Sequence, residues 1–296
     1  LLARALPPRA SMSLAAAAGH LWYRLDGRRR ARARESLRIA EAGGLEVEDR
    51  EALVRRTFQA LMMIPIEVLV FPRYFPNARA MVRRTRFVGD YEAFRRDVAA
   101  GRGGVAIAGH LGSWELSAWA LRFMEVPARV VVRPIANPHV ERRTARSRGG
   151  AGAVIGKRGA VREVLGSLRE GAWVAILADQ NAGAGGPFIP FFGTPASTYA
   201  TPAVAAQRAG VPIWAAACLR RDAPPYHYEL HLKRLPPAPE DLDERAAAAH
   251  TLRAFKAALE GWIRLAPEQY NWVHRRWRTR PKGEPRGSAT PRYDRP

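Results

Sequence analysis

The chain has 296 residues and 47% hydrophobic content, which is enough for a sizeable core in one large domain or two small ones. Its formal net charge of +21 at pH 7 favours acidic partners: nucleic acid, an anionic membrane or a phosphorylated substrate. The single cysteine, Cys218, excludes an internal disulfide framework and a zinc site built from several cysteines.

The N-terminal region combines an apolar segment with clustered arginines. Residues 10–23 contain no Lys, Arg, Asp or Glu, and seven arginines follow between positions 24 and 38. The apolar part is shorter than the roughly 18 to 20 residues of a membrane-spanning helix, and its basic flank is typical of an interfacial membrane helix. A solvated basic helix and a nucleic-acid patch are the alternatives. Membrane binding is favoured over nucleic acid because few aromatic side chains interleave with these arginines to stack on bases.

A glycine-bounded apolar run and the helical pattern after it form the most informative stretch. Residues 104–109 (GVAIAG) predict a buried strand and 114–124 a helix. On one continuous helix, the side chains of His110 and Glu115 would point about 140° apart. We therefore expect a turn at Gly112, with Glu115 reaching back to Nδ1 of His110 and leaving Nε2 as a general base. The spacing fits an ordinary strand-end histidine and a first-turn acid equally well.

Short strands and helices alternate in the rest of the chain, which predicts an α/β sheet covered by helices. An apolar segment at 60–71 is interrupted by Pro65 and Glu67, and it is expected to form part of the hydrophobic core rather than line an acyl-chain pocket. We expect a basic amphipathic region over 1–45, one catalytic domain over 46–281 and a disordered tail over 282–296. The expected strands are 128–132, 172–177, 211–218 and 226–232, and the expected helices are 158–169, 202–209 and 246–265.

The spacing of the candidate residues argues against several common kinds of site. The glycines between 149 and 159 do not form a nucleotide-binding phosphate loop, because Ala151 and Arg158 stand at required positions of that motif. His227 and His231 alternate with apolar residues as in a strand, which places them about 13 Å apart and makes a metal site improbable. The zinc-protease and serine-hydrolase motifs are absent from the sequence.

These exclusions leave a base without an obvious protein nucleophile. Such a base suits direct transfer of an activated group to a substrate hydroxyl, with His110 removing the proton as the oxygen attacks a thioester carbonyl. Ser113 is the other candidate nucleophile. Its position immediately before a helical pattern favours the role of helix N-cap instead.

Several sequence blocks follow one another in an order that is more specific than any single motif. They are His110 to Glu115, Arg133-Pro134 with Asn137-Pro138, Arg146 and Arg148, 157–159 (KRG), 178–181 (ADQN), 188–196 (FIPFFGTPA) and 267–281 (PEQYNWVHRRWRTRP). Together they resemble the late acyltransferases of lipid A biosynthesis, the lauroyl and myristoyl transferase group of the lysophospholipid acyltransferase superfamily. The resemblance runs from about Leu1 to Pro281 and is most specific in the last block.

The resemblance implies a fold, a reaction and partners. The fold is a single α/β domain of the glycerol-3-phosphate acyltransferase type, with a mixed central sheet flanked by helices. The reaction is transfer of a fatty acyl group, usually from acyl carrier protein, to a hydroxyl of a lipid A precursor at the cytoplasmic face of the bacterial inner membrane. We expect no metal, no cofactor and no nucleic-acid partner. The carrier protein is acidic and the acceptor carries phosphates, so both would bind a surface rich in arginine. Arginine suits phosphate because it binds it in bidentate fashion.

The resemblance also assigns site residues, with His110 and Glu115 as the catalytic pair. Asp179 has the alternative of capping a turn after its strand, and Arg158 that of a solvated first-turn cation. Arg275 and Arg276 are expected either to brace the site or to bind phosphate. The candidates for substrate binding are Arg133, Arg158, Gly159, Asp179 and Gln180.

The sequence departs from the family pattern in two places. Ser113 stands where asparagine is common, and no complete N-terminal transmembrane helix is present, so we expect either a truncated start or peripheral binding through the basic region. An acyltransferase acting on another glycolipid, such as a phosphatidylinositol mannoside, is the alternative enzyme. A basic nucleic-acid-binding protein is the alternative from a different class, and it predicts DNA affinity that survives changes at His110 and falls steeply with salt.

Overall fold

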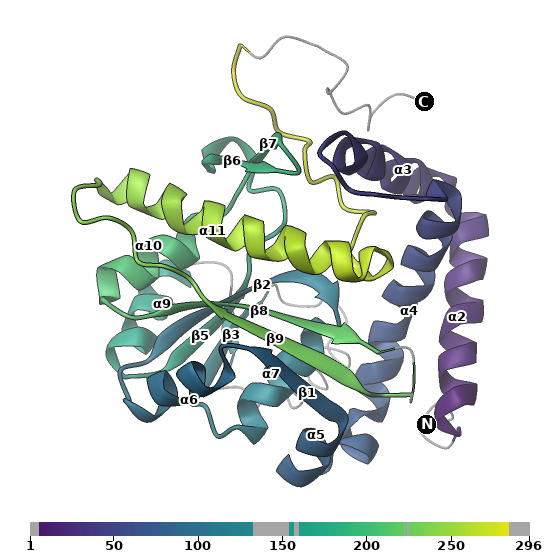
Figure 1. The fold of residues 1–296 in the computed structure, drawn as a ribbon, viewed down its shortest axis with the longest axis horizontal. Coiled ribbons are helices and arrows are strands. Elements are labelled where there is room, and N and C mark those ends of the chain that lie inside the picture. The colour runs from purple at the N-terminus through teal and green to yellow at the C-terminus, as the bar shows by residue number, and fades with distance from the viewer. Residues whose placement is uncertain (1–5, 133–153, 157–159, 222, 224, 284–296) are drawn as a thin grey trace.

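The computed structural model describes residues 6–132, 154–156, 160–221, 223 and 225–283. Within them, a seven-stranded sheet has the order β1-β9-β8-β2-β5-β3-β4 (Figure 1). β9 runs antiparallel to β8 and parallel to β1, and the other neighbouring strands are parallel. The strands are β1 (Thr85–Gly89), β2 (Gly104–Gly112), β3 (Ala128–Val132), β4 (Val154–Gly156), β5 (Trp173–Leu177), β8 (Ile213–Arg220) and β9 (Tyr228–Arg234).

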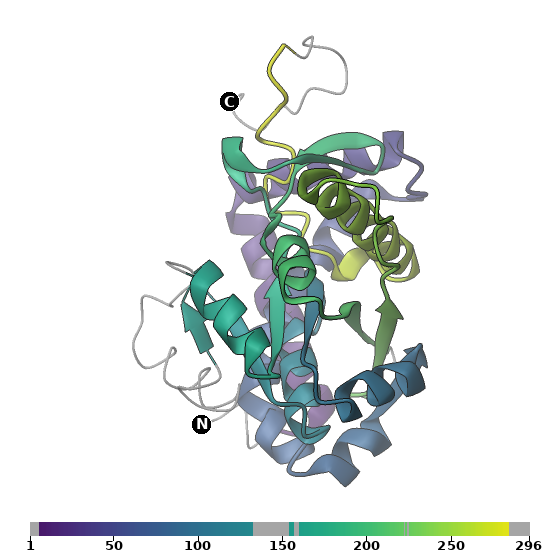
Figure 2. The same cartoon turned by 90° about the vertical axis from the view of Figure 1, so that its left-hand side faces the viewer.

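Helices cover both faces of this sheet, and Figure 2 shows the layers from the side. A separate hairpin, β6 (Phe188–Phe191) with β7 (Thr194–Ser197), packs against α11. The helices are α2 (Pro8–Leu25), α3 (Gly27–Ala42), α4 (Arg50–Tyr74), α5 (Ala78–Arg84), α6 (Tyr91–Ala99), α7 (Trp114–Phe123), α9 (Ala160–Arg169), α10 (Thr201–Ala209) and α11 (Glu244–Leu265), with short 3-10 turns η2 (Gly183–Gly185) and η3 (Pro267–Gln269).

Two hydrophobic cores lie on opposite faces of the sheet, and β8 contributes to both. Its side chains alternate: Ala215 and Ala217 pack with α9, α10 and α11, while Trp214 and Cys218 pack with α6, α7 and the second half of α4. Burial of every β8 residue except the last explains why this strand reads as a continuous apolar run rather than an alternating one. The predicted burial of the Cys218 thiol is confirmed.

The N-terminal helices pack onto the same body. α2 lies along α4, and the two are side by side at the right of Figure 1. α3 places Ala33, Leu37 and Ile39 in the core that also contains α11 and β2. Among the described residues, no helix has the length and apolar character needed to cross a membrane.

The α/β fold with a mixed central sheet flanked by helices is confirmed. The elements expected from 104 onward are all present, with ends displaced by a few residues. The largest displacement is in β2, which does not stop at Gly109 and instead contains His110. Of the tail expected over 282–296, residues 284–296 lie outside the described residues.

Candidate active site

A bulge in β2 sets the position of His110. The register with β8 runs from Ala108 opposite Ala216 to Gly112 opposite Cys218, so β2 uses four steps where β8 uses two. The extra residues bend the strand and re-aim its side chains. Gly112 makes the bend possible: its φ is +63°, and an added Cβ would lie 2.0 Å from the carbonyl oxygen of Cys218. The expected turn at Gly112 is therefore present.

Asp179, rather than Glu115, holds the ring of His110. Oδ1 of Asp179 lies 2.7 Å from Nδ1 of His110, and Oδ2 accepts a hydrogen bond from the His110 backbone N–H at 2.8 Å. Ala108 pairs with Leu177 in the parallel β2–β5 ladder, and His110 and Asp179 each stand two residues beyond that pair. The expected hydrogen bond from Nδ1–H of His110 to Glu115 is wrong, because Asp179 at the end of the neighbouring strand accepts it instead.

Glu115 is nevertheless part of the site. It lies in the first turn of α7, is 9% exposed, and its negative charge favours the protonated form of His110. Trp114, next to it, places its ring 5.1 Å from that of His110. The sequence correctly placed these residues near one another, but it assigned the orienting contact to the wrong carboxylate.

Burial and charge oppose each other in setting the pKa values of the pair. Burial by itself lowers the pKa of His110, but the charge and hydrogen bond of Asp179, with the charge of Glu115, raise it above its ordinary value. Burial disfavours the ionised form of Asp179, yet His110 and the charge of Lys256 hold the pKa of that carboxyl well below its usual range. Asp179 is therefore ionised at neutral pH and fixes the proton of His110 on Nδ1.

The other ring nitrogen of His110 faces polar neighbours. Nε2 of Gln180 lies 3.3 Å from Nε2 of His110, so the Gln180 amide donates to the free electron pair when Nδ1 carries the proton. Burial, with the positive charges of His110, Arg276 and Arg275, lowers the pKa of His274 to about 4. His274 is consequently neutral at pH 7 and does not compete with His110 for the proton.

The C-terminal block, residues 267–281, makes backbone and side-chain hydrogen bonds to the segments that form the site. The backbone N–H of Asn271 donates to the carbonyl oxygen of His110 at 3.0 Å, and Tyr270 forms a bridge with Leu111. Arg276 is 1% exposed; its guanidinium donates to Thr198 Oγ1 at 2.6 Å and to the Ser197 carbonyl. Of the two roles left open for Arg276, the structure supports bracing.

A buried ion pair fixes the turn after His110. Ser113 donates its hydroxyl proton to Glu67 on α4 at 2.9 Å and makes no side-chain capping bond to α7. Glu67 also accepts from Arg220 at 2.6 and 2.8 Å and from Tyr228 at 2.9 Å. Ser113 therefore stands at the N-cap position of α7, as expected, but its side chain is turned to Glu67 and accepts no capping hydrogen bond from the helix backbone. Only the tertiary structure brings α4, β8 and β9 to this turn.

An apolar cavity opens beside the site, between α7 and the sheet. It encloses about 780 Å³ of space not filled by protein atoms, part of which is open to solvent. Trp114 and Glu115 line it near His110, and Phe94, Met124 and Trp214 line it farther away. A predominantly apolar lining of this kind suits an apolar ligand.

Of the residues predicted to bind substrate, some lie at the site and others lie outside the described residues. Arg133, Arg158 and Gly159 lie outside the described residues. Asp179 and Gln180, expected to line the site, contact His110 itself. Asp179 gave one usable signal: His110 and Asp179 each stand three residues after the isoleucine of a Val-Ala-Ile triplet, at 105–107 and 174–176. Within the described part of the chain, no group of His, Cys, Asp or Glu side chains is arranged to hold a metal ion.

Comparison with known proteins identifies the family of the chain. The family model described as bacterial lipid A biosynthesis acyltransferase matches residues 1–279. The chain belongs to this family. It is an acyltransferase of lipid A biosynthesis, as the order of its sequence blocks indicated.

Named relatives include two from Escherichia coli (strain K12). The chain is 29% identical to a lipid A biosynthesis palmitoleoyltransferase over 245 residues, covering 80% of this chain and 75% of that protein. It is also 29% identical to a lipid A biosynthesis lauroyltransferase over 247 residues, covering 80% and 76%. A 1-acyl-sn-glycerophosphate acyltransferase from Thermotoga maritima is similar at 12% identity, 86% and 98% coverage and a TM-score of 0.40. The fold class stated above rests on the sheet order, not on that last similarity.

Proposed function

We propose that this acyltransferase uses His110 as a general base, oriented by Asp179, to transfer a fatty acyl group from an acyl carrier protein thioester to a hydroxyl of a lipid A precursor. The observation that carries the proposal is the double hydrogen bond between Asp179 and His110. It fixes the tautomer in which Nε2 is unprotonated and can accept a proton. Glu115, buried beside the pair, raises the basicity of the ring.

The reaction then needs one proton acceptor and no covalent enzyme intermediate. The acceptor hydroxyl takes the place of the Gln180 amide at Nε2 of His110 and transfers its proton there as its oxygen attacks the thioester carbonyl. The new C–O bond forms, the C–S bond breaks, and the leaving thiolate takes the proton from His110. Ser113 is not a nucleophile in this scheme, because it is fully buried and hydrogen-bonded to Glu67.

The apolar cavity suits the acyl chain of the donor. Its lining on α7 follows one helix face, from Trp114 through Leu121 to Met124, and the sheet supplies Ala106 and Ala108 opposite. The small alanine side chains leave room between helix and sheet. Because the cavity begins at Trp114, which contacts the His110 ring, a chain lying in it would place its thioester carbonyl beside the base.

The acceptor phosphates have a candidate site where α3 meets the C-terminal segment around His274. Burial lowers the pKa of Arg32 on α3, and the charge of Arg275 lowers it further, so two guanidinium groups lie near each other. Nε of Arg32 has no hydrogen-bond partner among the described residues. One turn farther along α3, the hydroxyl of Ser36 donates to the carbonyl oxygen of His274 at 3.4 Å, which joins α3 to the active-site segment. An anionic group between Arg32 and Arg275 would relieve their repulsion.

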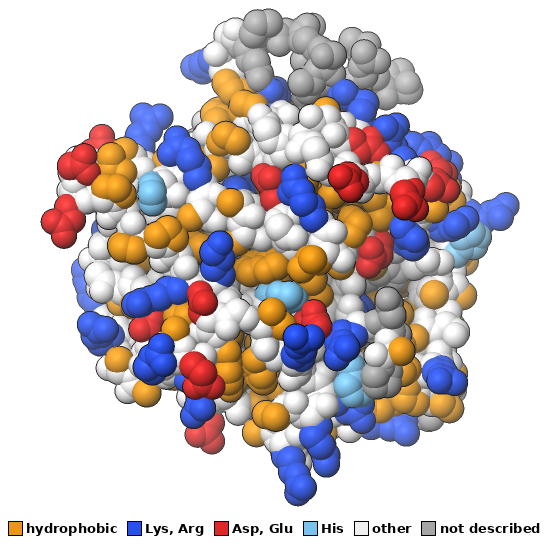
Figure 3. All heavy atoms as spheres, viewed as in Figure 1, with side chains coloured by type: hydrophobic (Ala, Val, Ile, Leu, Met, Phe, Trp, Pro, Cys, Tyr) orange, Lys and Arg blue, Asp and Glu red, His pale blue; other side chains and the backbone are white. Residues whose placement is uncertain are grey.

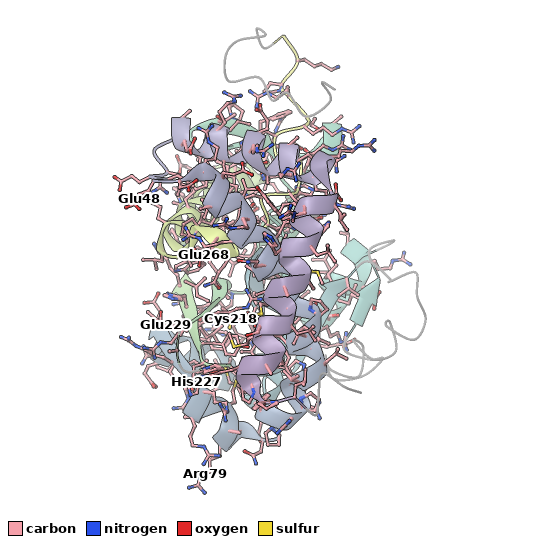
Figure 4. The ribbon with its side chains drawn as sticks, turned by 90° about the vertical axis from the view of Figure 1, so that its right-hand side faces the viewer. Glu48, Arg79, Cys218, His227, Glu229 and Glu268 are labelled. Atoms are coloured by element: carbon pink, nitrogen blue, oxygen red, sulfur yellow. The ribbon has the colours of Figure 1, made fainter. Side chains whose placement is uncertain are left out.

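We also propose that α2 binds an anionic membrane surface, which would place the site at the cytoplasmic face of the inner membrane. Leu14, Leu21 and Leu25 are 50%, 57% and 76% exposed and lie on one side of the helix. Exposed Arg24 and Arg28 flank them. Figure 4 shows α2 as the outermost helix on its side, with Cys218 behind it. By contrast, Lys and Arg in Figure 3 are interspersed with Asp and Glu over the visible face.

The experiment that tests the base is acyl transfer by the His110→Ala variant. With acyl carrier protein donor and a purified lipid A precursor, we expect product measured by mass spectrometry to fall by about 10²- to 10⁴-fold, the usual contribution of general-base catalysis. Circular dichroism controls for folding. Running the wild-type protein in parallel with acyl coenzyme A decides whether the donor must be carrier protein. Turnover by the folded variant within a few fold of wild type would overturn the base assignment.

A further inference from the structure

Met124 lies at the boundary of two hollows of the molecule. It lines the apolar cavity that begins at Trp114, and it also lines a second hollow on the other side of the α7 C-terminus. The second hollow encloses about 890 Å³ of space free of protein atoms, part of it open to solvent. Its walls come from α5, β1 and α6, with Val82, Phe87 and Val98 among them. The second hollow is the more polar of the two, because Arg95 and Glu125 also line it, and Met124 belongs to the lining of both.

The position of Met124 is fixed by the end of α7. Val126 N–H donates to the carbonyl oxygen of Leu121 at 3.0 Å and Glu125 N–H to that of Arg122 at 3.1 Å. Glu125 has a φ of +56°, so the helix ends in a Schellman motif with Met124 as its C-cap. This arrangement holds the Met124 backbone in place at the boundary of the two hollows.

The cavity also has a definite length. α7 has ten residues, so the distance along its axis from Trp114 to Met124 is about 15 Å at 1.5 Å per residue. An extended acyl chain that starts at the base must end where the cavity closes. Methionine at that end is adaptable, because its unbranched side chain can take several conformations.

We propose that Met124 determines the acyl-chain length that this enzyme accepts, by closing the far end of the donor cavity, and that the second hollow receives the end of a longer chain once Met124 is shortened. The inference rests on the proposed function, because it takes the donor acyl chain to occupy the first cavity. The occupant of the second hollow is then the terminal segment of that same chain. The apolar side chains of Val82, Phe87 and Val98 in its lining, and the boundary that it shares with the first cavity at Met124, support this assignment.

The test is a competition among three donors. Equal amounts of dodecanoyl, tetradecanoyl and hexadecanoyl acyl carrier protein are offered with one lipid A precursor, and products are separated by mass. We expect Met124→Ala to raise the ratio of hexadecanoyl to dodecanoyl product by about 10-fold, since a few methylene groups in an apolar pocket are worth a discrimination of this size. Met124→Phe should change the ratio in the opposite direction. Phe123→Ala is the matched control, because Phe123 lines only the second hollow and should leave the ratio unchanged.

The outcomes separate the inference from the proposed function. A wild-type protein that transfers none of the three acyl groups would overturn the proposed function and this inference together. An active enzyme whose product ratio is the same in Met124→Ala, Met124→Phe and wild type would overturn the inference alone. A ratio that changes equally in Phe123→Ala would also overturn it, because the effect would then come from the helix end in general.

Discussion

Asp179 accepts two hydrogen bonds from a single residue, one from the backbone N–H of His110 and one from its ring Nδ1. Both groups lie two residues beyond the last pair of the β2–β5 ladder, so the sheet itself brings them together. A carboxylate has an acceptor oxygen for each N–H, and each of its oxygens is used. The geometry of the base is thus fixed by strand pairing rather than by a flexible loop.

Asp179→Asn should reduce acyl transfer by about 10²- to 10⁴-fold, in the range usual for loss of acid–base catalysis. An asparagine offers one oxygen and one NH₂ group, so it cannot accept from both N–H groups of His110. Steady-state kinetics should show the loss mainly in kcat, because the acyl cavity is untouched. The control is Gln180→Ala, whose side chain contacts Nε2 but does not fix the tautomer; its loss should be smaller. Equal losses in both variants would contradict the orienting role of Asp179.

The pH dependence of kcat/KM should show an acidic limb set by His110. The pKa of His110 is raised by Asp179 and Glu115 against the effect of burial, so the base gains its proton at a higher pH than an ordinary histidine does. Activity should therefore rise with pH through a midpoint above about 6.5. In Asp179→Asn the raising charge is lost and burial dominates, which should move the limb to lower pH. A limb that stays in place would show that another group controls it; His274, with its pKa of about 4, titrates too low to do so.

Glu67→Gln should destabilise the protein by about 3–5 kcal/mol, because it leaves the Arg220 charge buried without its partner. The two side chains are 3% and 11% exposed. The matched control is Glu244→Gln, which removes the partner of Arg208 from a solvent-exposed pair and should cost far less, because water screens that interaction. Chemical denaturation measures both. The double variant Glu67→Gln/Arg220→Met should recover part of the loss, and equal costs for the two single variants would refute the argument.

Gly112→Ala should impair both folding stability and activity. The added Cβ would meet the Cys218 carbonyl oxygen at 2.0 Å, so the bulge that aims His110 must move. Gly101→Ala is a control for backbone strain alone: its φ of +66° is similar, but nothing lies within 4 Å of the added Cβ. We expect Gly101→Ala to cost about 1–2 kcal/mol and to leave turnover intact. Thermal denaturation and turnover of the two variants would contradict the bulge argument if they were indistinguishable.

Leu21→Ser should weaken binding to anionic vesicles by about 10-fold, since only the exposed part of Leu21 is newly buried, which is worth roughly half of the 1.5–3 kcal/mol of a whole leucine. Leu21 is 57% exposed on α2. Val161→Ser, on α9 at the other side of the molecule, removes a side chain of 50% exposure and should leave binding unchanged. Flotation with phosphatidylglycerol and phosphatidylcholine vesicles measures both variants. High salt should weaken binding to the anionic vesicles only in part, because the leucines contribute apart from the arginines. Equal binding by wild type and Leu21→Ser would refute the assignment of α2.

The sequence by itself determined the fold class, the family, the order of elements and His110 as the candidate base. These depend on local signals: glycine-bounded apolar runs such as 104–109, helical periodicity, and ordered motifs. The tertiary structure decided which carboxylate holds the histidine, because parallel pairing of β2 with β5 joins residues 69 positions apart. The tertiary structure also decided that Ser113 donates to Glu67 on α4, and that Met124 lines two hollows. Contacts between distant segments depend on strand register and helix packing, which periodicity in a single sequence does not encode.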